Sequence, residues 1–308
     1  MKADLPAEGA RLRVGIGIAT VGRALILRDI LKDMAQQTQQ PDRIMVCHTA
    51  ASDIAGILPE DMPPGVEARF MVSAAGLPRQ RNVILDTSAG LDIVLFIDDD
   101  FVMAPRFIEA VLRCFHDNPH IVGVTGRVIH DDARGPGLGV VAGREKIAAD
   151  AATQGSALDT AWRAAPHCYG CNMAYRMDVV RAKMLRFDER LPLYGWSEDI
   201  DFAHRIARHG MLAKLEGARG VHLGVKQART AGRRLGYSQV ANQLYLLGKG
   251  SYSAGRAGRS IARNIAANSL RALWPEPYID RRGRLAGNAL ALVDMVRGRM
   301  KPERILEL

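Results

Sequence analysis

The sequence of 308 residues has few cysteines and no long hydrophobic run, and both shortages exclude classes of protein. No stretch reaches the roughly 18 uninterrupted apolar residues of a membrane-spanning helix. The N-terminal stretch MKADLPAEGARLR lacks the apolar segment of a signal peptide. We therefore expect a cytoplasmic protein, either soluble or peripheral on the inner face of the cytoplasmic membrane.

Of the four cysteines, only Cys168 and Cys171 form a C-x-x-C pair, a spacing found in redox pairs and half zinc sites. A zinc site usually needs a second pair of Cys or His residues at similar spacing, and none follows. We expect two reduced, packed cysteines, with metal or redox use as the alternative.

Charge is unevenly spread along the chain. The net charge is +9, but the segment from Val225 onward holds sixteen Lys and Arg against five Asp and Glu, so the rest carries about −2. A basic segment of this kind binds anionic lipid, nucleic acid or an acidic polymer, or is a solvated helical surface. Nucleic-acid binders interleave aromatic and basic residues, and this segment has few aromatics.

Short apolar, β-branched segments alternate with segments whose apolar residues recur at helical spacing. We expect strands at 13–20, 43–50, 67–73, 91–97 and 120–129, and helices at 22–37, 77–88 and 104–118. This order predicts an α/β fold with a Rossmann-like, mostly parallel central sheet flanked by helices. Residues 130–165 read as a long loop or short-helix insertion, and the chain after about 226 as a helical extension.

Three aspartates, Asp98, Asp99 and Asp100, follow the most apolar expected strand. Ligands bind beyond the carboxyl ends of strands in such sheets, where Thr20 and Asp53 are also expected. Carboxylates this close raise one another's pKa unless a positive group neutralises them. Hard oxygen ligands suit Mg²⁺ or Mn²⁺, with phosphate oxygens completing the shell. The alternative is a turn whose aspartates cap the following helix.

A second acidic cluster follows the turn Gly195–Ser197, with three acids at Glu198, Asp199 and Asp201. Ser197 suits a helix N-cap, and the helix macrodipole favours acids in the first turn. One of these acids could be a general base if the helix starts at the edge of an active site. A well-capped helix is the alternative.

Taken in order, these segments resemble the inverting family 2 glycosyltransferases with the GT-A fold, which are nucleotide-diphospho-sugar transferases, of the bacterial polysaccharide-assembly type. The resemblance runs from about Val14 to His222. It rests on the opening strand and helix, on Asp53, and on three segments: GLPRQRNVILDTSAGLDIVLFIDDD, GCNMAYRMDVV and GWSEDIDFAHRIARHG. It implies a GT-A catalytic domain at 1–225, with donor and acceptor halves at about 13–130 and 166–225, and a basic helical extension at 226–308.

The resemblance also implies an activity. The enzyme would be a hexosyltransferase-like protein that moves a sugar, with inversion, from a nucleotide-diphosphate donor to an acceptor hydroxyl. The first donor that we expect is a UDP-sugar. The expected acceptor is a saccharide or a lipid-linked molecule. Asp199 would be the catalytic base, and Glu198 would orient the acceptor or the base. Mg²⁺ or Mn²⁺ would be held by Asp100 and Asp98, with His222 nearby.

Further roles are implied for residues on the donor and acceptor sides. The donor would be contacted by Thr20, Asp53, Arg79, Arg81, Asn82, Asp98 and Asp99. Trp196 and Asn172 would bind the acceptor. Ordinary structural roles remain open for several of these: a surface charge for either arginine, a strand-end histidine for His222 and a core position for Trp196.

Two other functions compete with this interpretation. A nucleotidyltransferase acting on a sugar phosphate would need a Gly-rich, basic first loop, and ATVGRA offers only Gly22 and Arg23. A non-enzymatic nucleic-acid-binding protein would use the basic segment, but the acidic clusters would face the wrong partner. In the transferase interpretation, the segment with Arg259, Arg263, Leu270 and Trp274 would be a helix that lies on an anionic membrane, or a helical cap.

Overall fold

The computed structural model describes residues 11–155 and 157–308, so the first ten residues of the N-terminal stretch in which we expect no signal peptide lie outside the described residues. Internal contacts divide the chain into two compact units. The first comprises residues up to Ala74, Gln80–Arg186 and Ala203–Gln227. The second comprises Ala75–Arg79, Phe187–Phe202 and Ala228–Leu308, so it joins the expected C-terminal extension to an earlier segment of the chain.

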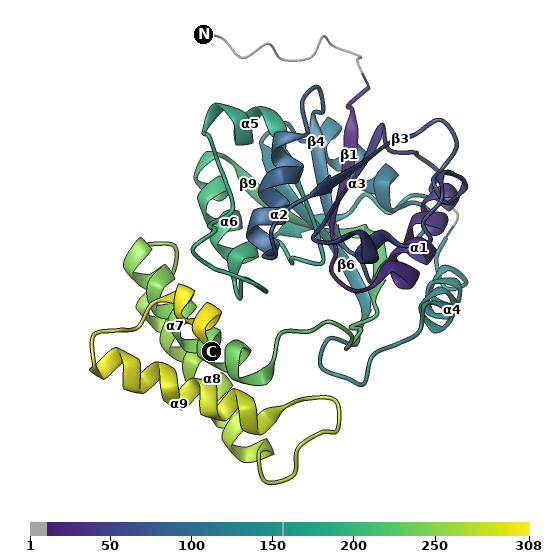
Figure 1. Ribbon diagram of the computed structural model, residues 1–308. Helices are drawn as coiled ribbons and strands as arrows, with labels where there is room; N and C mark the ends of the chain where they lie inside the picture. The colour runs from purple at the N-terminus through teal and green to yellow at the C-terminus, as the bar shows by residue number, and fades with distance from the viewer. Residues whose placement is uncertain (1–10, 156) are drawn as a thin grey trace. The chain divides into compact units, whose positions relative to one another are not determined.

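The first unit is built on one sheet, in which the described strands follow the order β3-β2-β1-β4-β8-β6-β9-β5, with β7 paired to β9 (Figure 1). The pairs β3–β2, β2–β1, β1–β4 and β6–β9 are parallel, whereas β8, β5 and β7 pair antiparallel. The strands are β1 (Val14–Ala19), β2 (Arg43–His48), β3 (Glu67–Val72), β4 (Ile93–Asp98), β5 (Phe101–Met103), β6 (Ile121–Asp131), β7 (Trp162–Ala164), β8 (Asn172–Arg176) and β9 (Met211–His222). This confirms the α/β class with a mostly parallel sheet.

Helices flank this sheet, as the periodicity predicts. They are α1 (Ala24–Asp33), α2 (Leu77–Asp86), α3 (Phe107–Asp117), α4 (Val140–Ala151), α5 (Met177–Ala182) and α6 (Glu198–Ile206), with short 3₁₀ turns η1 (Met34–Gln36), η2 (Ala51–Ile54), η3 (Pro59–Asp61) and η4 (Ala207–His209). The first residues of α2 and α6, up to Arg79 and Phe202, belong to the second unit. The expected insertion at 130–165 contains α4 and β7. Cys168 and Cys171 are buried and form no disulfide.

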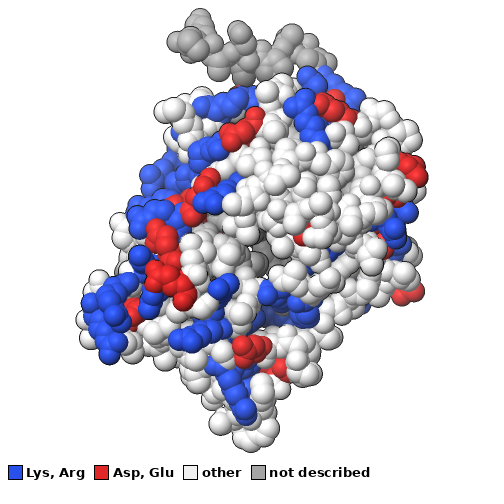
Figure 2. Space-filling model, viewed as in Figure 1, with Lys and Arg blue, Asp and Glu red and all other residues white. Residues whose placement is uncertain are grey.

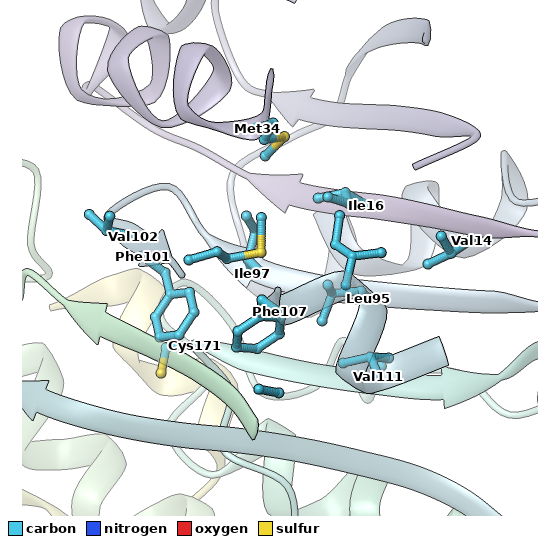
Figure 3. Packing of buried hydrophobic residues seen from close by; sticks show 14 of the residues in the cluster. Val14, Ile16, Met34, Leu95, Ile97, Phe101, Val102, Phe107, Val111 and Cys171 are labelled. Carbon is cyan, nitrogen blue, oxygen red and sulfur yellow. The ribbon is translucent and has the colours of Figure 1, made fainter. Parts of the chain in front are cut away.

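The alternation of side chains along β1 explains how its two faces are covered. Val14, Ile16 and Ile18 are buried in the main core cluster, together with apolar residues of α1 and α3 (Figure 3). The opposite face of β1 carries glycines, and a Cβ at Gly17 would lie only 2.6 Å from the side chain of Ile84 in α2. The missing side chains therefore let α2 pack closely against β1.

The second unit contains the C-terminal helices α7 (Gly232–Lys249), α8 (Ala254–Arg271) and α9 (Arg281–Val296), followed by η5 (Pro302–Glu307). Glycines allow α7 and α9 to approach closely. A Cβ at Gly236 would lie 2.0 Å from the carbonyl oxygen of Arg284, and a Cβ at Gly287 would lie 2.0 Å from that of Arg233. None of the helices in the described part of the chain is long and apolar enough to cross a membrane.

We predict that Gly236→Ala lowers the free energy of unfolding of the second unit by about 1–3 kcal/mol, because the new methyl group would overlap the backbone of α9. Gly248 is the matched control, since it lies in the same helix and a Cβ there would meet no neighbouring residue within 4 Å. Gly248→Ala should raise stability by up to about 1 kcal/mol through helix propensity. Urea unfolding followed by circular dichroism measures both, and equal effects would contradict the close packing.

Candidate active site

Strand register brings three expected metal ligands to one place at the edge of the sheet. Asp98 ends β4 and pairs with Ala19 at the end of β1. The short strand β5 begins directly after Asp100 and runs antiparallel to β9, which places His222 opposite Phe101. Residues separated by more than 120 positions in the sequence therefore meet beyond the carboxyl ends of β1 and β4, where ligands bind in sheets of this kind.

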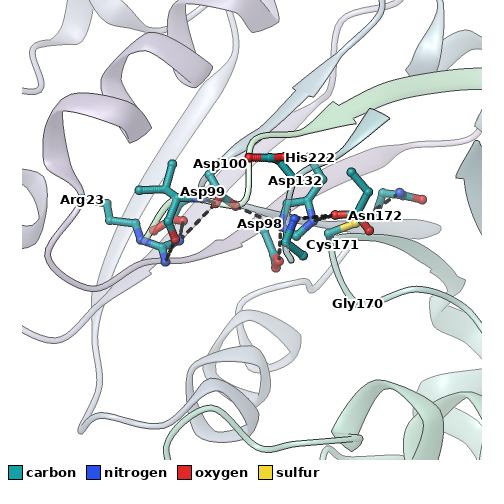
Figure 4. Close-up of polar contacts among 12 residues, drawn as sticks. Arg23, Asp98, Asp99, Asp100, Asp132, Gly170, Cys171, Asn172 and His222 are labelled. Atoms are coloured by element: carbon teal, nitrogen blue, oxygen red, sulfur yellow. Dashed lines mark hydrogen bonds and ion pairs between the residues drawn. The ribbon is translucent and has the colours of Figure 1, made fainter. Parts of the chain in front are cut away.

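Asp98, Asp100 and His222 each offer a ligand atom, and these atoms all lie within 4.8 Å of one another. The side chains of Asp100 and His222 are buried, whereas Asp98 is partly exposed (Figure 4). Two carboxylate oxygens and one imidazole nitrogen form a donor set that fits Mn²⁺, and the carboxylates also suit Mg²⁺. The residues present therefore fit the ion that the sequence pattern implies.

Cations from other elements neutralise the aspartate triplet. Arg23, which precedes α1, places its Nη1 at 2.7 Å from Asp99 Oδ1 and at 3.5 Å from Asp100 Oδ2. Arg81 Nη2 of α2 lies 3.4 Å from Asp98 Oδ1. The capping alternative fails, because α3 begins after Arg106 and has no side-chain cap hydrogen bond. The aspartate triplet is therefore held by ion pairs with arginines and does not cap α3.

His222 is held between two carboxylates of the cluster. Its Nδ1 lies 2.9 Å from Asp131 Oδ1, and its Nε2 lies 3.4 Å from Asp100 Oδ1. Burial lowers the pKa of His222, but the hydrogen bonds to Asp100 and Asp131 outweigh it and raise this pKa to about 10. Burial raises the pKa of Asp99 to about 6, against the opposing effect of Arg23. Without an ion, the proton on His222 thus supplies positive charge to the cluster.

The expected donor-side residues fall into three environments. Thr20 Oγ1 donates to Asp99 Oδ2 at 2.7 Å, so it belongs to the aspartate cluster. Burial raises the pKa of Asp53, but hydrogen bonds from the Thr49 hydroxyl and from the backbone of Gly22, Thr49 and Ala50 outweigh it and lower this pKa. Asp53 therefore ties the loop after β2 to the loop after β1.

The remaining donor-side residues lie on α2. Arg81 and Asn82 are buried, and Arg81 Nη2 also donates to the carbonyl oxygen of Gly170 at 2.8 Å. Arg79 belongs to the second unit, where it is half-exposed and pairs with Glu189 at 3.3 Å. Of the two arginines, only Arg81 therefore contacts the aspartate cluster directly.

The expected acceptor-side and catalytic residues divide between the two units. Asn172 lies in β8 of the first unit, fully buried, and its Oδ1 accepts from Thr125 Oγ1 at 2.9 Å and from the backbone of Gly126 at 2.6 Å. Trp196, Glu198 and Asp199 lie in the second unit, with Glu198 buried and the other two partly buried. The roles assigned to these residues stay predictions.

Sequence interpretation did not include three side chains that the structure places at this site. Arg23 and Asp131 pair with the aspartates and with His222. Gln80 of α2 donates to the carbonyl oxygens of Thr20 at 3.0 Å and Cys47 at 2.8 Å, and so holds the ends of β1 and β2 together. The one usable signal was Arg23, a lone cation three residues after the end of the expected strand 13–20.

Comparison with known proteins gives a family for this arrangement. The model of the family described as "Glycosyl transferase family 2" matches residues 16–182, more than half of the chain. This range contains most of β1 and the whole aspartate triplet, and ends before the acidic turn of α6. No curated protein matches the sequence.

Several solved structures share the fold of this chain at low sequence identity. S. aureus TarS is 14% identical with a TM-score of 0.50, and the match covers 86% of this chain but only 44% of TarS. A structure of S. aureus TarS 1-349 in complex with UDP-GlcNAc is 14% identical with a TM-score of 0.53, covering 96% of this chain and 83% of that one.

The mannosyltransferase PcManGT from Pyrobaculum calidifontis, solved in complex with GDP-Man and Mn²⁺, is 16% identical with a TM-score of 0.54, covering 94% of this chain and 87% of that one. At sequence identities of 14% and 16%, these solved structures show that the fold is shared and nothing more. Because the family model matches more than half of the chain, including the aspartate triplet, the chain belongs to glycosyl transferase family 2 and is a glycosyltransferase.

Proposed function

We propose that the protein transfers a sugar from a nucleotide-diphosphate donor to an acceptor hydroxyl, with inversion at the anomeric carbon. The observation that carries this proposal is the convergence of Asp98, Asp100 and His222 at the carboxyl end of β4, in a chain of glycosyl transferase family 2. It favours a transferase over the nucleotidyltransferase and nucleic-acid-binding alternatives.

The diphosphate leaving group sets the main electrostatic demand of the reaction. Its negative charge grows as the bond to the anomeric carbon breaks, and fixed positive charge at that point lowers the barrier. Asp98, Asp100 and His222 would hold Mg²⁺ or Mn²⁺, which when bound supplies this charge as a Lewis acid. Arg23 and Arg81, already paired with the triplet, keep the three carboxylates compensated and fixed in position.

The proton of the acceptor hydroxyl needs a base on the opposite side of the sugar. In the proposed reaction, the acceptor oxygen forms a bond to the anomeric carbon while the bond to the diphosphate oxygen breaks, which inverts the centre. Asp199 takes the proton of the attacking hydroxyl, and Glu198 orients the acceptor or the base. Both carboxylates lie in the first turn of α6, and a positioned carboxylate of this kind can act as a general base.

The proposal also names a class of donor and a class of acceptor. A UDP-sugar is the first donor to test, and a GDP-sugar the second, since solved relatives of the fold are described with UDP-GlcNAc and GDP-Man. The acceptor is a saccharide or lipid-linked hydroxyl. Thr20, Asp53, Arg81 and Asn82 would form the donor side of the site, and Trp196 the acceptor side.

We predict that one nucleotide-sugar in a panel releases its nucleoside diphosphate with Mn²⁺ and not with excess EDTA. Asp100→Asn should lower kcat at least 100-fold, because a neutral amide is a poor ligand for a hard cation. Asp199→Asn should lower kcat by about 10²–10⁴-fold with little change in the donor KM, because it removes the base and not a donor contact.

Asp117→Asn serves as the control, because Asp117 is an exposed carboxylate of α3 that pairs with Arg113 away from the cluster. It should behave as the unchanged enzyme. Turnover that persists in EDTA, or an Asp100→Asn variant with full activity, would contradict the proposed use of the ion.

We also propose that the second unit contacts an anionic membrane surface. Leu270, Leu273 and Trp274, at the end of α8 and directly after it, are 71%, 66% and 82% exposed. Arg259, Arg263 and Arg271 are exposed on the same helix, and Figure 2 shows Lys and Arg side chains interspersed with acidic ones on the visible face. Exposed apolar side chains beside several cations match anionic lipid, since each basic residue near such a surface contributes about 1 kcal/mol.

A double variant tests this surface. Leu270→Ser with Trp274→Ser should lower the fraction of protein that sediments with vesicles of anionic phospholipid at least 10-fold, because it removes the apolar area that would enter the lipid. Met184→Ser, at an equally exposed apolar residue of the first unit, should bind as the unchanged protein does. If the unchanged protein stays in the supernatant, the proposal is wrong.

A further inference from the structure

The loop before α6 holds an unfavourable backbone conformation. Leu193, Gly195 and Ser197 have φ angles of 58°, 62° and 71°, so three alternate residues occupy the left-handed region. For a residue with a side chain, this region costs on the order of 1–2 kcal/mol. Such a conformation persists only where the surrounding structure imposes it, and it is common at functional sites.

Two amide side chains of α7 hold this loop. Asn242 Nδ2 donates to the carbonyl oxygen of Trp196 at 3.0 Å, and Gln243 Nε2 donates to Ser197 Oγ at 2.9 Å. The two amides are 0% and 1% exposed, so these hydrogen bonds are shielded from water. Both donors and both acceptors belong to the second unit.

The same helix and the turn that follows it fix the other end of the acidic turn. Asp201 is fully buried and lies 2.9 Å from Lys249 Nζ at the end of α7. Ser251 Oγ donates to the second oxygen of Asp201. Glu198 and Asp199 are therefore bracketed by Ser197 and Asp201, which are both held by α7 and its C-terminal turn.

The side-chain carbonyl oxygens of the two amides indicate why Asn and Gln occupy these positions. Asn242 Oδ1 and Gln243 Oε1 are buried and find no hydrogen-bond partner among the described residues. A buried carbonyl without a partner costs about 1–3 kcal/mol, so apolar side chains would pack at lower cost. The amide N–H groups, which reach the loop, are the part of each side chain that the fold uses.

We infer that Asn242 and Gln243 are positioning residues for the Glu198–Asp199 turn, so that the C-terminal helix α7 is part of the transferase machinery. The inference rests on the proposed function, in which Asp199 is the base. A base must stay within hydrogen-bond reach of the attacking hydroxyl, and a misplacement of about 1 Å can cost about 100-fold in rate. The two amides act through the loop and contact no reacting atom.

The test compares the same substitution at two positions of one helix. Gln243→Met removes the donor to Ser197 and keeps the volume of the side chain. Gln239→Met, one turn earlier, is the matched control, because Gln239 is equally buried but accepts from Asn268 at 3.0 Å, inside the helical bundle. Asn242→Leu removes the second donor to the loop in the same manner.

Two readouts separate positioning from general stability. In the full-length protein, Gln243→Met and Asn242→Leu should speed amide hydrogen exchange in peptides that span 193–201, and Gln239→Met should not. With the active donor and Mn²⁺, the two loop variants should lower kcat about 10- to 100-fold and leave the donor KM within about twofold. Gln239→Met should lower the melting temperature and retain kcat.

Loop exchange that matches the unchanged protein in both variants would overturn the inference, as would a loss of kcat no larger than that of Gln239→Met. The exchange readout needs no substrate. If the unchanged protein releases no nucleoside diphosphate from any donor, the proposed function fails, while the exchange experiment still decides whether the two amides hold the turn.

Discussion

The pairing of Asp98, Asp99 and Asp100 with cations from other elements is the interaction on which the first unit depends. Three carboxylates in consecutive positions cannot remain charged beside one another without compensation. Arg23 brings the start of α1 to this point, Arg81 brings α2, and the β5–β9 pairing brings His222. The same contacts that relieve the repulsion also gather the ligand atoms of the cluster, so the stability of this sheet edge and its chemistry have one origin.

In the second unit, side chains of another element likewise hold the other acidic cluster in position. The turn that carries Glu198 and Asp199 follows a loop in a costly backbone conformation, and α7 holds that loop through buried amides. The segment Phe187–Phe202 therefore groups with the C-terminal helices and not with the sheet that precedes it. The sequence alone presents the C-terminal helices as an extension of the catalytic domain. We infer that one of them, α7, holds the loop that carries the proposed base.

Periodicity predicted the sheet, its flanking helices and the C-terminal helices, because alternating and helical apolar patterns report burial directly. It also predicted that Thr20, Asp53 and the aspartate triplet would lie at one edge, since strand ends of a parallel sheet share it, whereas His222 was placed near the metal only by the family resemblance. Asp131 was missed because it reaches His222 through the β6–β9 pairing, whose register shifts at Thr125/Arg127 and Val128/His130. Asn242 and Gln243 were missed because polar residues within a helical pattern are normally solvent-exposed, and nothing local indicates that these two are buried.

The central claim is that Asp98, Asp100 and His222 together hold a divalent cation that in turn binds the diphosphate of the donor. Calorimetric titration of nucleoside diphosphates into the full-length protein, with Mn²⁺ and then with EDTA, tests it without knowledge of the sugar or the acceptor. The account predicts binding of one nucleoside diphosphate that requires Mn²⁺ and is lost in Asp100→Asn. Absence of metal-assisted binding for every nucleoside diphosphate, or equal binding by Asp100→Asn, would contradict it.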